Sequence, residues 1–188
     1  MKKISCAKIQ PSKALLLAIL KNRSFQKKRV VLSSGKISDY YFDGRVTSLT
    51  GEGAYLIADI ILEMIKNDNI DAVGGLTLGA DPIIGAIISL GFKKNLPLAG
   101  FIVRKEKKKH GMQKLIEGPL LEKSGRVLIV DDVVTTGAST IQAIKAVRKQ
   151  GAKIVRVIAV VDRLEGAKQN IKKLGLKLEA IFTIKDFK

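Results

Sequence analysis

Short apolar segments rich in β-branched residues alternate along this chain with longer segments of helical period, and this alternation restricts the possible folds most strongly. The apolar segments cover residues 72–76, 98–103, 127–130, 154–161 and 178–184. The helical segments cover residues 12–22, 53–67, 82–90, 138–150 and 165–174. Strands without polar alternation have both faces covered by helices. The sequence therefore predicts an α/β fold, a parallel sheet flanked by helices, with ligands bound at the carboxyl ends of the strands.

Length and composition fit one globular domain. The 188 residues are 46% hydrophobic and 27% charged, and no apolar run reaches the roughly 18 residues that a membrane helix needs. The basic amino-terminal segment is not followed directly by the apolar core of a signal peptide, so we expect a cytoplasmic protein without a membrane partner. Cys6 is the only cysteine, which excludes an internal disulfide and a cysteine-rich metal site.

The net charge of +17 allows two interpretations. Lysine and arginine neutralise phosphates, so an RNA or DNA partner is one of them. Aromatic residues make up only 5% of the chain and tryptophan is absent, which leaves few surfaces on which bases could stack. Many basic residues, such as those at 27–29 and 172–173, occupy expected surface positions. General basicity is therefore favoured over nucleic-acid binding.

The segment VLIVDDVVTTGAST, residues 127–140, contains features of a phosphate site. An apolar strand over 127–130 is followed by a loop at 135–137 and by a helix from Ala138. The N–H groups and the positive dipole end of a helix N-terminus favour a phosphate. Hydroxyls of the threonines and of Ser139 add donors, and Gly137 allows the backbone to approach closely.

Asp131 and Asp132 need a separate explanation, because carboxylates repel phosphate. They fit a ligand that carries hydroxyls or a bound cation next to its phosphate. A ribose 5-phosphate has vicinal hydroxyls that can donate to carboxylates, and Mg²⁺ on an attached diphosphate can be held directly or through water. The alternative is that Asp132 only caps the turn. The combination of Asp-Asp with Thr-Thr-Gly at a strand–helix junction favours the sugar-phosphate ligand.

A polar, basic segment at 104–111, continuing to about Gly118, lies between two apolar strands. A loop that closes over an anionic ligand is one interpretation. A solvated run of charge is the other. His110 is the only histidine of the chain, so a site with several histidine ligands is excluded.

The segment VLIVDDVVTTGAST resembles the phosphoribosyl-pyrophosphate motif of the type I phosphoribosyltransferases. Four further segments resemble one branch of that family, the orotate phosphoribosyltransferases. They are LSSGKISDYYFDGR (32–45), GGLTLGADPIIGA (74–86), RKEKKKHG (104–111) and VVDRLEGA (160–167). The resemblance covers most of the chain from about residue 24 to 167. It implies a single phosphoribosyltransferase domain over residues 1–188, with a small hood built mainly from about residues 1–45.

The resemblance also implies a reaction. The family transfers the 5-phosphoribosyl group of 5-phospho-α-D-ribose 1-diphosphate to orotate, with Mg²⁺, and forms orotidine 5′-phosphate and diphosphate in de novo pyrimidine biosynthesis. It implies a homodimer in which the 104–111 loop acts on the neighbouring subunit. The alternatives are a phosphoribosyltransferase for another nucleobase and a basic RNA-binding regulator that retains the pocket.

Site residues follow from the matching motif positions. Asp131 and Asp132 would hold the ribose hydroxyls and the surroundings of Mg²⁺, which the substrate itself mainly holds. The 5-phosphate would be bound by Val133, Val134, Thr135, Thr136, Gly137, Ala138 and Ser139. From the basic loop, the residues implied to bind the sugar diphosphate are Arg104, Lys105, Lys108 and His110. The catalytic residues implied are Lys105, Lys108, His110, Asp131 and Asp132. Gly79 and Ala80 match the loop that lines the diphosphate, whereas Lys107 and Lys109 are interpreted as solvated charge.

Orotate binding is assigned to Thr135, Arg163, Tyr40 and Tyr41. A guanidinium at the carboxyl end of a strand can fork onto the carboxylate or a carbonyl of orotate. The alternative for Arg163 is an ordinary ion pair, for example with Glu165, and that for each aromatic ring is a place in the hood core.

The sequence also departs from many bacterial relatives, which have lysines where it has Ser33 and Asp81-Pro82. These departures leave fewer fixed cations near the base and the diphosphate.

Overall fold

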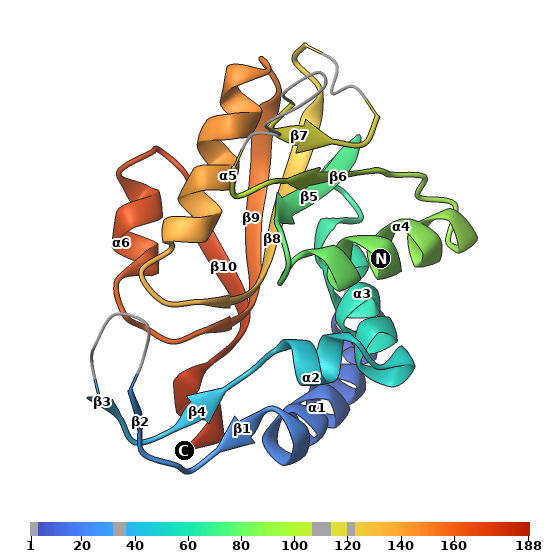
Figure 1. Cartoon of the computed structure of the whole chain (residues 1–188). Helices are drawn as coiled ribbons and strands as arrows, with labels where there is room; N and C mark the ends of the chain where they lie inside the picture. The colour runs from blue at the N-terminus through green and yellow to red at the C-terminus, as the bar shows by residue number, and fades with distance from the viewer. Residues whose placement is uncertain (1–3, 32–36, 107–113, 120–122) are drawn as a thin grey trace.

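A mostly parallel sheet forms the centre of the computed structural model, which describes residues 4–31, 37–106, 114–119 and 123–188 (Figure 1). Within these ranges the sheet has the strand order β10–β9–β8–β5–β6–β7. Its strands are β5 (Ala72–Leu76), β6 (Ala99–Val103), β7 (Ile116–Glu117), β8 (Arg126–Val134), β9 (Lys153–Asp162) and β10 (Leu178–Thr183). Neighbouring strands are parallel except for β7, which runs antiparallel to β6. The predicted α/β fold is confirmed.

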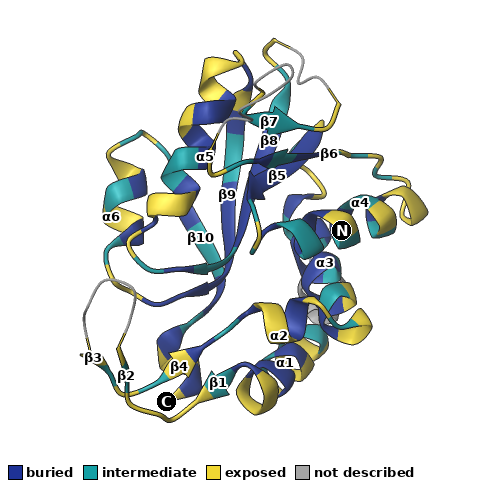
Figure 2. Ribbon diagram, in the orientation of Figure 1, coloured by how far each residue is buried: buried dark blue, intermediate teal, exposed yellow. Residues whose placement is uncertain are grey.

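Helices cover both faces of this sheet (Figures 1 and 2). On one face lie α3 (Gly51–Ile65) and α4 (Asp81–Lys93), and on the other lie α5 (Ala138–Lys149) and α6 (Ala167–Lys172). The remaining helices, α1 (Ile4–Arg23) and α2 (Arg45–Ser48), pack against α3. Alternate residues of β8 enter two different cores: Leu128 and Val130 pack with α3 and α4, whereas Val127 and Ile129 pack with α5. Burial on both sides explains why the strands carry no polar alternation. No helix within the described ranges combines the length and apolarity that crossing a membrane requires.

Strand β8 is longer than the sequence predicted. The prediction ended this strand at Val130, whereas β8 continues through Asp131 and Asp132 to Val134. The neighbouring strand is the reason, because β9 continues to Asp162 and pairs with β8 up to that residue. The two aspartates therefore lie near the carboxyl end of a paired strand rather than in the following turn.

Other element ends also differ from the prediction. Helix α1 begins at Ile4 and includes Pro11, although proline lacks the N–H that an interior helical position donates. Helix α6 begins only at Ala167, after Gly166 in a left-handed conformation with φ of +105°. The last strand stops at Thr183, and the 3-10 helix η1 follows it over Ile184–Phe187. Hydrophobic periodicity located these elements but not their ends.

Two pairs of short strands lie beside the main sheet (Figure 1). β1 (Phe25–Gln26) pairs antiparallel with β4 (Tyr41–Phe42), and β2 (Val30–Val31) pairs antiparallel with β3 (Ile37–Ser38). Phe187 of η1 packs against this region, with ring centroids 5.8 Å from Phe25 and 5.1 Å from Phe42. Part of the segment in which a hood is expected, about residues 1–45, is thus in contact with the carboxyl-terminal part of the chain, and its role as a hood stays a prediction. Strands of two residues are too short to give a period in the sequence.

Candidate active site

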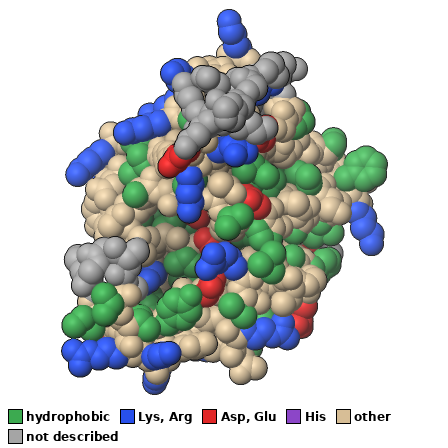
Figure 3. Space-filling view, in the orientation of Figure 1, with side chains coloured by type: hydrophobic (Ala, Val, Ile, Leu, Met, Phe, Trp, Pro, Cys, Tyr) green, Lys and Arg blue, Asp and Glu red, His purple; other side chains and the backbone are tan. Residues whose placement is uncertain are grey.

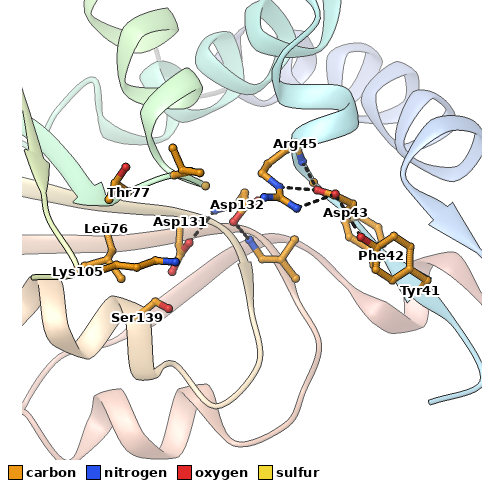
Figure 4. A pocket seen from close by; sticks show the side chains of 14 residues that line it. Tyr41, Phe42, Asp43, Arg45, Leu76, Thr77, Lys105, Asp131, Asp132 and Ser139 are labelled. Atoms are coloured by element: carbon orange, nitrogen blue, oxygen red, sulfur yellow. Dashed lines mark hydrogen bonds and ion pairs between the residues drawn. The ribbon is translucent and has the colours of Figure 1, made fainter. Parts of the chain in front are cut away.

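A cavity of about 270 Å³ opens at the carboxyl ends of β5 and β8, where the fold predicted a ligand site (Figure 4). The strand ends, the loop after β5, the segment after β6 and the β4–α2 turn form its walls. It is lined by Tyr41, Phe42, Asp43, Gly44, Arg45, Leu76, Thr77, Leu78, Gly79, Lys105, Asp131, Asp132, Val133 and Ser139. The structure thus brings the two aspartates together with residues far apart in the sequence.

Asp131 has the most perturbed carboxyl of the site. It is buried, its Oδ2 accepts a hydrogen bond from Thr140 Oγ1 at 2.7 Å, and its Oδ1 accepts one from the backbone N–H of Asp132 at 3.1 Å. Burial, helped by repulsion from the Asp132 carboxylate, raises the pKa of Asp131 to about 7, although the Thr140 hydrogen bond opposes the rise. A cation or a hydroxyl donor reaching this carboxyl would favour its ionised form.

Asp132 lies next to it and is packed closely by two glycines. Burial raises the pKa of this carboxyl, while the N–H of Val133, 2.8 Å from Oδ1, and the positive charge of Arg45 act in the opposite direction. A Cβ atom on Gly79 would lie 2.3 Å from Asp132 Oδ1, and one on Gly44 would lie 3.1 Å from Oδ2. The glycines therefore allow two loops to approach the carboxylate from both sides.

The loop after β8 leads into helix α5 as the sequence predicted. Gly137 caps the helix with a φ of +80°, a conformation that favours glycine. The carbonyls of Thr135 and Thr136 accept hydrogen bonds from Ala167 N at 3.2 Å and from Asn170 Nδ2 at 2.9 Å. These contacts fix the loop from the side of α6. The backbone N–H groups of the loop and the N-terminus of α5 are then available to bind an anion.

The seven residues assigned to the 5-phosphate are placed differently from one another. Val133 and Ser139 line the cavity. Val134 is buried in the core, and its carbonyl accepts a hydrogen bond from the backbone N–H of Arg163 at 2.9 Å. Thr136, Ala138 and Ser139 are exposed. Any part that Val134 plays in binding is thus limited to its backbone.

The basic segment is described only in part. Lys105 lines the cavity, and its side chain points toward Asp131 (Figure 4). Its carbonyl accepts a hydrogen bond from Gln142 Nε2 at 2.7 Å, which ties the start of the segment to α5. Arg104 pairs instead with Glu117, 3.4 Å from Nη1 to Oε1, and is not among the lining residues. Ser33, Lys107, Lys108, Lys109 and His110 lie outside the described residues.

Of the residues assigned to orotate, Tyr41 lines the cavity, and Thr135, Tyr40 and Arg163 do not. Arg163 is buried, and its Nε lies 2.9 Å from Glu165 Oε1 and donates to Tyr40 Oη at 3.1 Å. Its guanidinium carbon lies 4.8 Å from the centre of the Tyr40 ring. The ion pair with Glu165 that the sequence suggested as an alternative is therefore present, and orotate binding by Arg163 stays a prediction.

Sequence reasoning missed a charged pair at the cavity wall. Asp43 accepts hydrogen bonds from the backbone N–H of Arg45 at 3.0 Å, from its Nε at 2.9 Å and from its Nη2 at 2.9 Å. These bonds lower the pKa of Asp43 and raise that of Arg45, so both groups are charged. The signal was the Asp-Gly-Arg spacing directly after the aromatic residues, within a segment already quoted for its resemblance.

The chain is similar to proteins of known function. The chain matches the family described as Phosphoribosyl transferase domain over residues 46–186. The orotate phosphoribosyltransferase of Rhodopseudomonas palustris is 43% identical over 179 residues, which cover 94% of this chain and 96% of that protein. The orotate phosphoribosyltransferase of Aquifex aeolicus is 48% identical over 155 residues, 82% of this chain and 84% of that protein.

Solved structures agree with the sequence relatives. The orotate phosphoribosyltransferase of Mycobacterium tuberculosis, in complex with 5-phospho-alpha-D-ribosyl 1-diphosphate, matches this chain with a TM-score of 0.79. It is 36% identical, and the match covers 94% of this chain and 99% of that one.

Proposed function

The chain belongs to the phosphoribosyltransferase family, within its orotate phosphoribosyltransferases, and from this premise we infer its reaction. The enzyme transfers the 5-phosphoribosyl group of 5-phospho-α-D-ribose 1-diphosphate to orotate, giving orotidine 5′-phosphate and diphosphate in de novo pyrimidine biosynthesis. The observation that carries the inference is the pair of neighbouring carboxyls, buried Asp131 and half-buried Asp132, beside a glycine-capped helix N-terminus in one cavity.

Two parts of the cavity bind the sugar phosphate. Its 5-phosphate binds the N–H groups and hydroxyls of residues 135–139, at the positive end of α5. The ribose hydroxyls donate to the carboxylates of Asp131 and Asp132. Because burial raises the pKa of both carboxyls, hydrogen bonds that a ligand donates to their ionised forms are stronger than hydrogen bonds to solvated carboxylates.

Departure of the diphosphate creates positive charge on the ribose and negative charge on the leaving group. Cations that approach only when the 104–111 loop closes stabilise the leaving group more in the transition state than in the ground state. Lys105 lies at the cavity already, and Arg104, Lys108 and His110 are assigned to the same task. Closure also keeps water from the activated sugar.

Magnesium is the proposed cofactor, and its chemistry is to neutralise the diphosphate oxygens. Carboxylate oxygens are suitable ligands for it, and Asp131 and Asp132 provide them at the cavity. Among the described residues no group of three metal-binding side chains exists. Asp131 and Asp132 would hold the ion directly or through water, and oxygens of the substrate would supply further ligands.

Orotate differs from other nucleobases by its carboxylate, which calls for a cation. Arg163 fills this role, held in place by Tyr40 and Glu165 through its Nε. The guanidinium has further N–H donors with which to fork onto the carboxylate. Tyr41 at the cavity wall packs against the ring, and Thr135 contributes a hydroxyl.

The enzyme works as a homodimer in which the 104–111 loop closes over the neighbouring subunit's site. An apolar hollow of about 640 Å³ beside the active-site cavity supports this, with Val46, Leu49, Leu78 and Pro82 among its lining residues. Leu49 is 72% exposed and Leu78 is 63% exposed. Figure 3 shows hydrophobic side chains gathered around charged ones in the middle of this face. Apolar surface of this kind next to a site is typical of a subunit contact. Ionic, water-soluble substrates are consistent with a cytoplasmic enzyme.

The decisive assay mixes the purified protein with orotate, the sugar diphosphate and Mg²⁺ and follows orotate by its ultraviolet absorbance. We expect the absorbance of orotate to fall, and omission of Mg²⁺ or addition of EDTA to stop the loss. Adenine, hypoxanthine and uracil serve as competing acceptors in parallel reactions. Turnover of one of these bases without turnover of orotate would refute the assignment of the base.

A further inference from the structure

Arg45 is a cation at the active-site cavity to which neither the motif nor the resemblance gives a role. It is the first residue of α2 and lines both the cavity of about 270 Å³ and the adjoining apolar hollow. Among the described residues the hydrogen bonds that Arg45 donates go to Asp43, while its carbonyl accepts one from the backbone N–H of Leu49 at 3.0 Å. Its side chain is 47% exposed, so a ligand in the cavity can reach it.

Asp43 holds the guanidinium by one edge. Nε and Nη2 donate to the two carboxylate oxygens at 2.9 Å each, and the backbone N–H of Arg45 adds a third bond at 3.0 Å. Tyr41 Oη donates to the same carboxylate at 3.3 Å. This forked geometry fixes the plane of the guanidinium and leaves the Nη1 donors for another acceptor.

The acidic groups around Arg45 indicate why a cation is needed at this wall of the cavity. Asp132 lies close enough for the charge of Arg45 to lower its pKa, and Asp43 and Asp131 add two further acidic groups to the cavity wall. A diphosphate entering this space would be repelled by the three carboxyl groups. Lys105 and Arg45 are the cations that line the cavity within the described ranges.

The position of Arg45 separates it from the 5-phosphate site. Figure 4 shows Asp132 between Arg45 on one side and Ser139 on the other. Arg45 shares both cavities with Leu78 of the loop after β5, whereas Ser139 belongs to the helix N-terminus assigned to the 5-phosphate. A ligand that spans the cavity from Ser139 thus reaches Arg45 with its far end.

We propose that Arg45 binds the diphosphate group of the sugar substrate, with Asp43 as the residue that positions its guanidinium. The proposal rests on the function proposed above and deepens it. It also accounts for the departure at Asp81-Pro82, where many relatives carry a lysine. Arg45 supplies a fixed cation from a different element of the fold.

Binding measurements on separate halves of the substrate test this role. Isothermal titration of magnesium diphosphate and of ribose 5-phosphate is carried out with the wild type, Arg45→Gln, Arg45→Lys and Asp43→Asn. Arg23→Gln is the matched control, because Arg23 is similarly exposed (42%) and ion-paired with Glu52 but lies outside the cavity. Thermal unfolding verifies that each variant is folded.

We expect Arg45→Gln to weaken magnesium diphosphate binding roughly 10- to 100-fold, as for loss of a charged hydrogen bond, and to change ribose 5-phosphate binding less than about twofold. In kinetics the KM for the sugar diphosphate should rise by a similar factor while the KM for orotate stays nearly constant. Arg45→Lys should recover part of the loss because the charge remains, and Asp43→Asn should show an intermediate effect.

Unchanged diphosphate binding in Arg45→Gln would overturn the proposal, as would an equal loss for both ligands. If Arg45→Gln does not fold, a normal diphosphate affinity in Arg45→Lys together with Asp43→Asn would overturn it as well. Failure of this proposal can be distinguished from failure of the proposed function. A wild-type protein that binds magnesium diphosphate through Arg45 but does not consume orotate would contradict the base assignment alone.

Discussion

Substitution of Asp131 by asparagine should stabilise the protein at alkaline pH, measured without substrate or Mg²⁺, and should abolish catalysis. The Asp131 carboxyl is buried beside Asp132, and these two effects raise its pKa to about 7, although Thr140 donates a hydrogen bond to it. The ionised form of this carboxyl is therefore unfavourable in its protein surroundings. Asparagine has nearly the same shape, can accept the Asp132 N–H with its Oδ1 and can donate to the Thr140 hydroxyl with its Nδ2.

The sign and size of the effect follow from proton linkage. Below about pH 4 Asp131 is protonated in the folded and the unfolded chain, and above about pH 7 it is ionised in both. Between these values the folded state binds more protons, so the wild-type free energy of unfolding falls as the pH rises. A pKa rise from 3.8 to about 7 corresponds to roughly 4 kcal/mol. This value already includes the hydrogen bond from Thr140 to the ionised carboxylate, so we expect Asp131→Asn to be more stable by about 2 to 4 kcal/mol at pH 8.

Urea unfolding of wild type and Asp131→Asn in EDTA, at pH 4.5 and at pH 8, measures this difference. We expect near-equal stability at pH 4.5 and a more stable variant at pH 8. Thr140→Val is the opposing control, because it removes the hydrogen bond that favours the ionised form and should destabilise more at pH 8 than at pH 4.5. An Asp131→Asn protein that is less stable by the same amount at both values would refute the reasoning.

Further predictions concern the loop, the base site, the glycine contact and the subunit contact. Lys108→Ala should lower kcat by roughly 100-fold or more with little change in orotate binding, and a mixed dimer with an Asp132→Asn chain should recover one working site, as measured by initial rates. Arg163→Lys should raise the KM for orotate roughly tenfold or more, because lysine cannot fork onto a carboxylate. Gly79→Ala should abolish sugar diphosphate binding in titration, because its Cβ would lie 2.3 Å from Asp132 Oδ1. Leu49→Glu should shift the protein from dimer to monomer in light scattering, because Leu49 is 72% exposed beside an apolar hollow.

The predictions for the loop, the base site and the subunit contact each have an outcome that would contradict them. An unchanged rate in Lys108→Ala excludes the loop mechanism, and a mixed dimer without activity excludes its action across subunits. A lower kcat with an unchanged KM for orotate in Arg163→Lys would contradict binding of the base by Arg163. A monomeric wild type would remove the basis of the Leu49→Glu experiment and of the dimer proposal.

The sequence predicted the sheet and the placement of the acidic pair at its carboxyl edge for identifiable reasons. Continuous apolar strands such as 127–130 have no solvent-facing side, and helices on both faces confirm this. Gly137 marks the start of α5 because its φ of +80° favours glycine. Features of this kind can be predicted from the sequence because a few neighbouring residues determine them.

The rest depends on contacts between distant segments. β8 extends to Val134 because β9 pairs with it, which no local pattern of either strand reveals. Arg45 comes to the cavity through the β4–α2 turn, and its partner Asp43 gives it a fixed orientation only in the folded chain. The ion pair of Arg163 with Glu165 was predicted as an alternative, because the two residues are only two positions apart in the sequence. The added bond to Tyr40 was not foreseen, because it joins residues 123 positions apart.

A crystal structure of the complex with 5-phospho-α-D-ribose 1-diphosphate and Mg²⁺ would test the central claim most directly. The account predicts ribose hydroxyls within hydrogen-bonding distance of the Asp131 and Asp132 carboxylates and the 5-phosphate against the amides of residues 135–139. Density for the sugar at another surface, with no ligand next to the two aspartates, would contradict it.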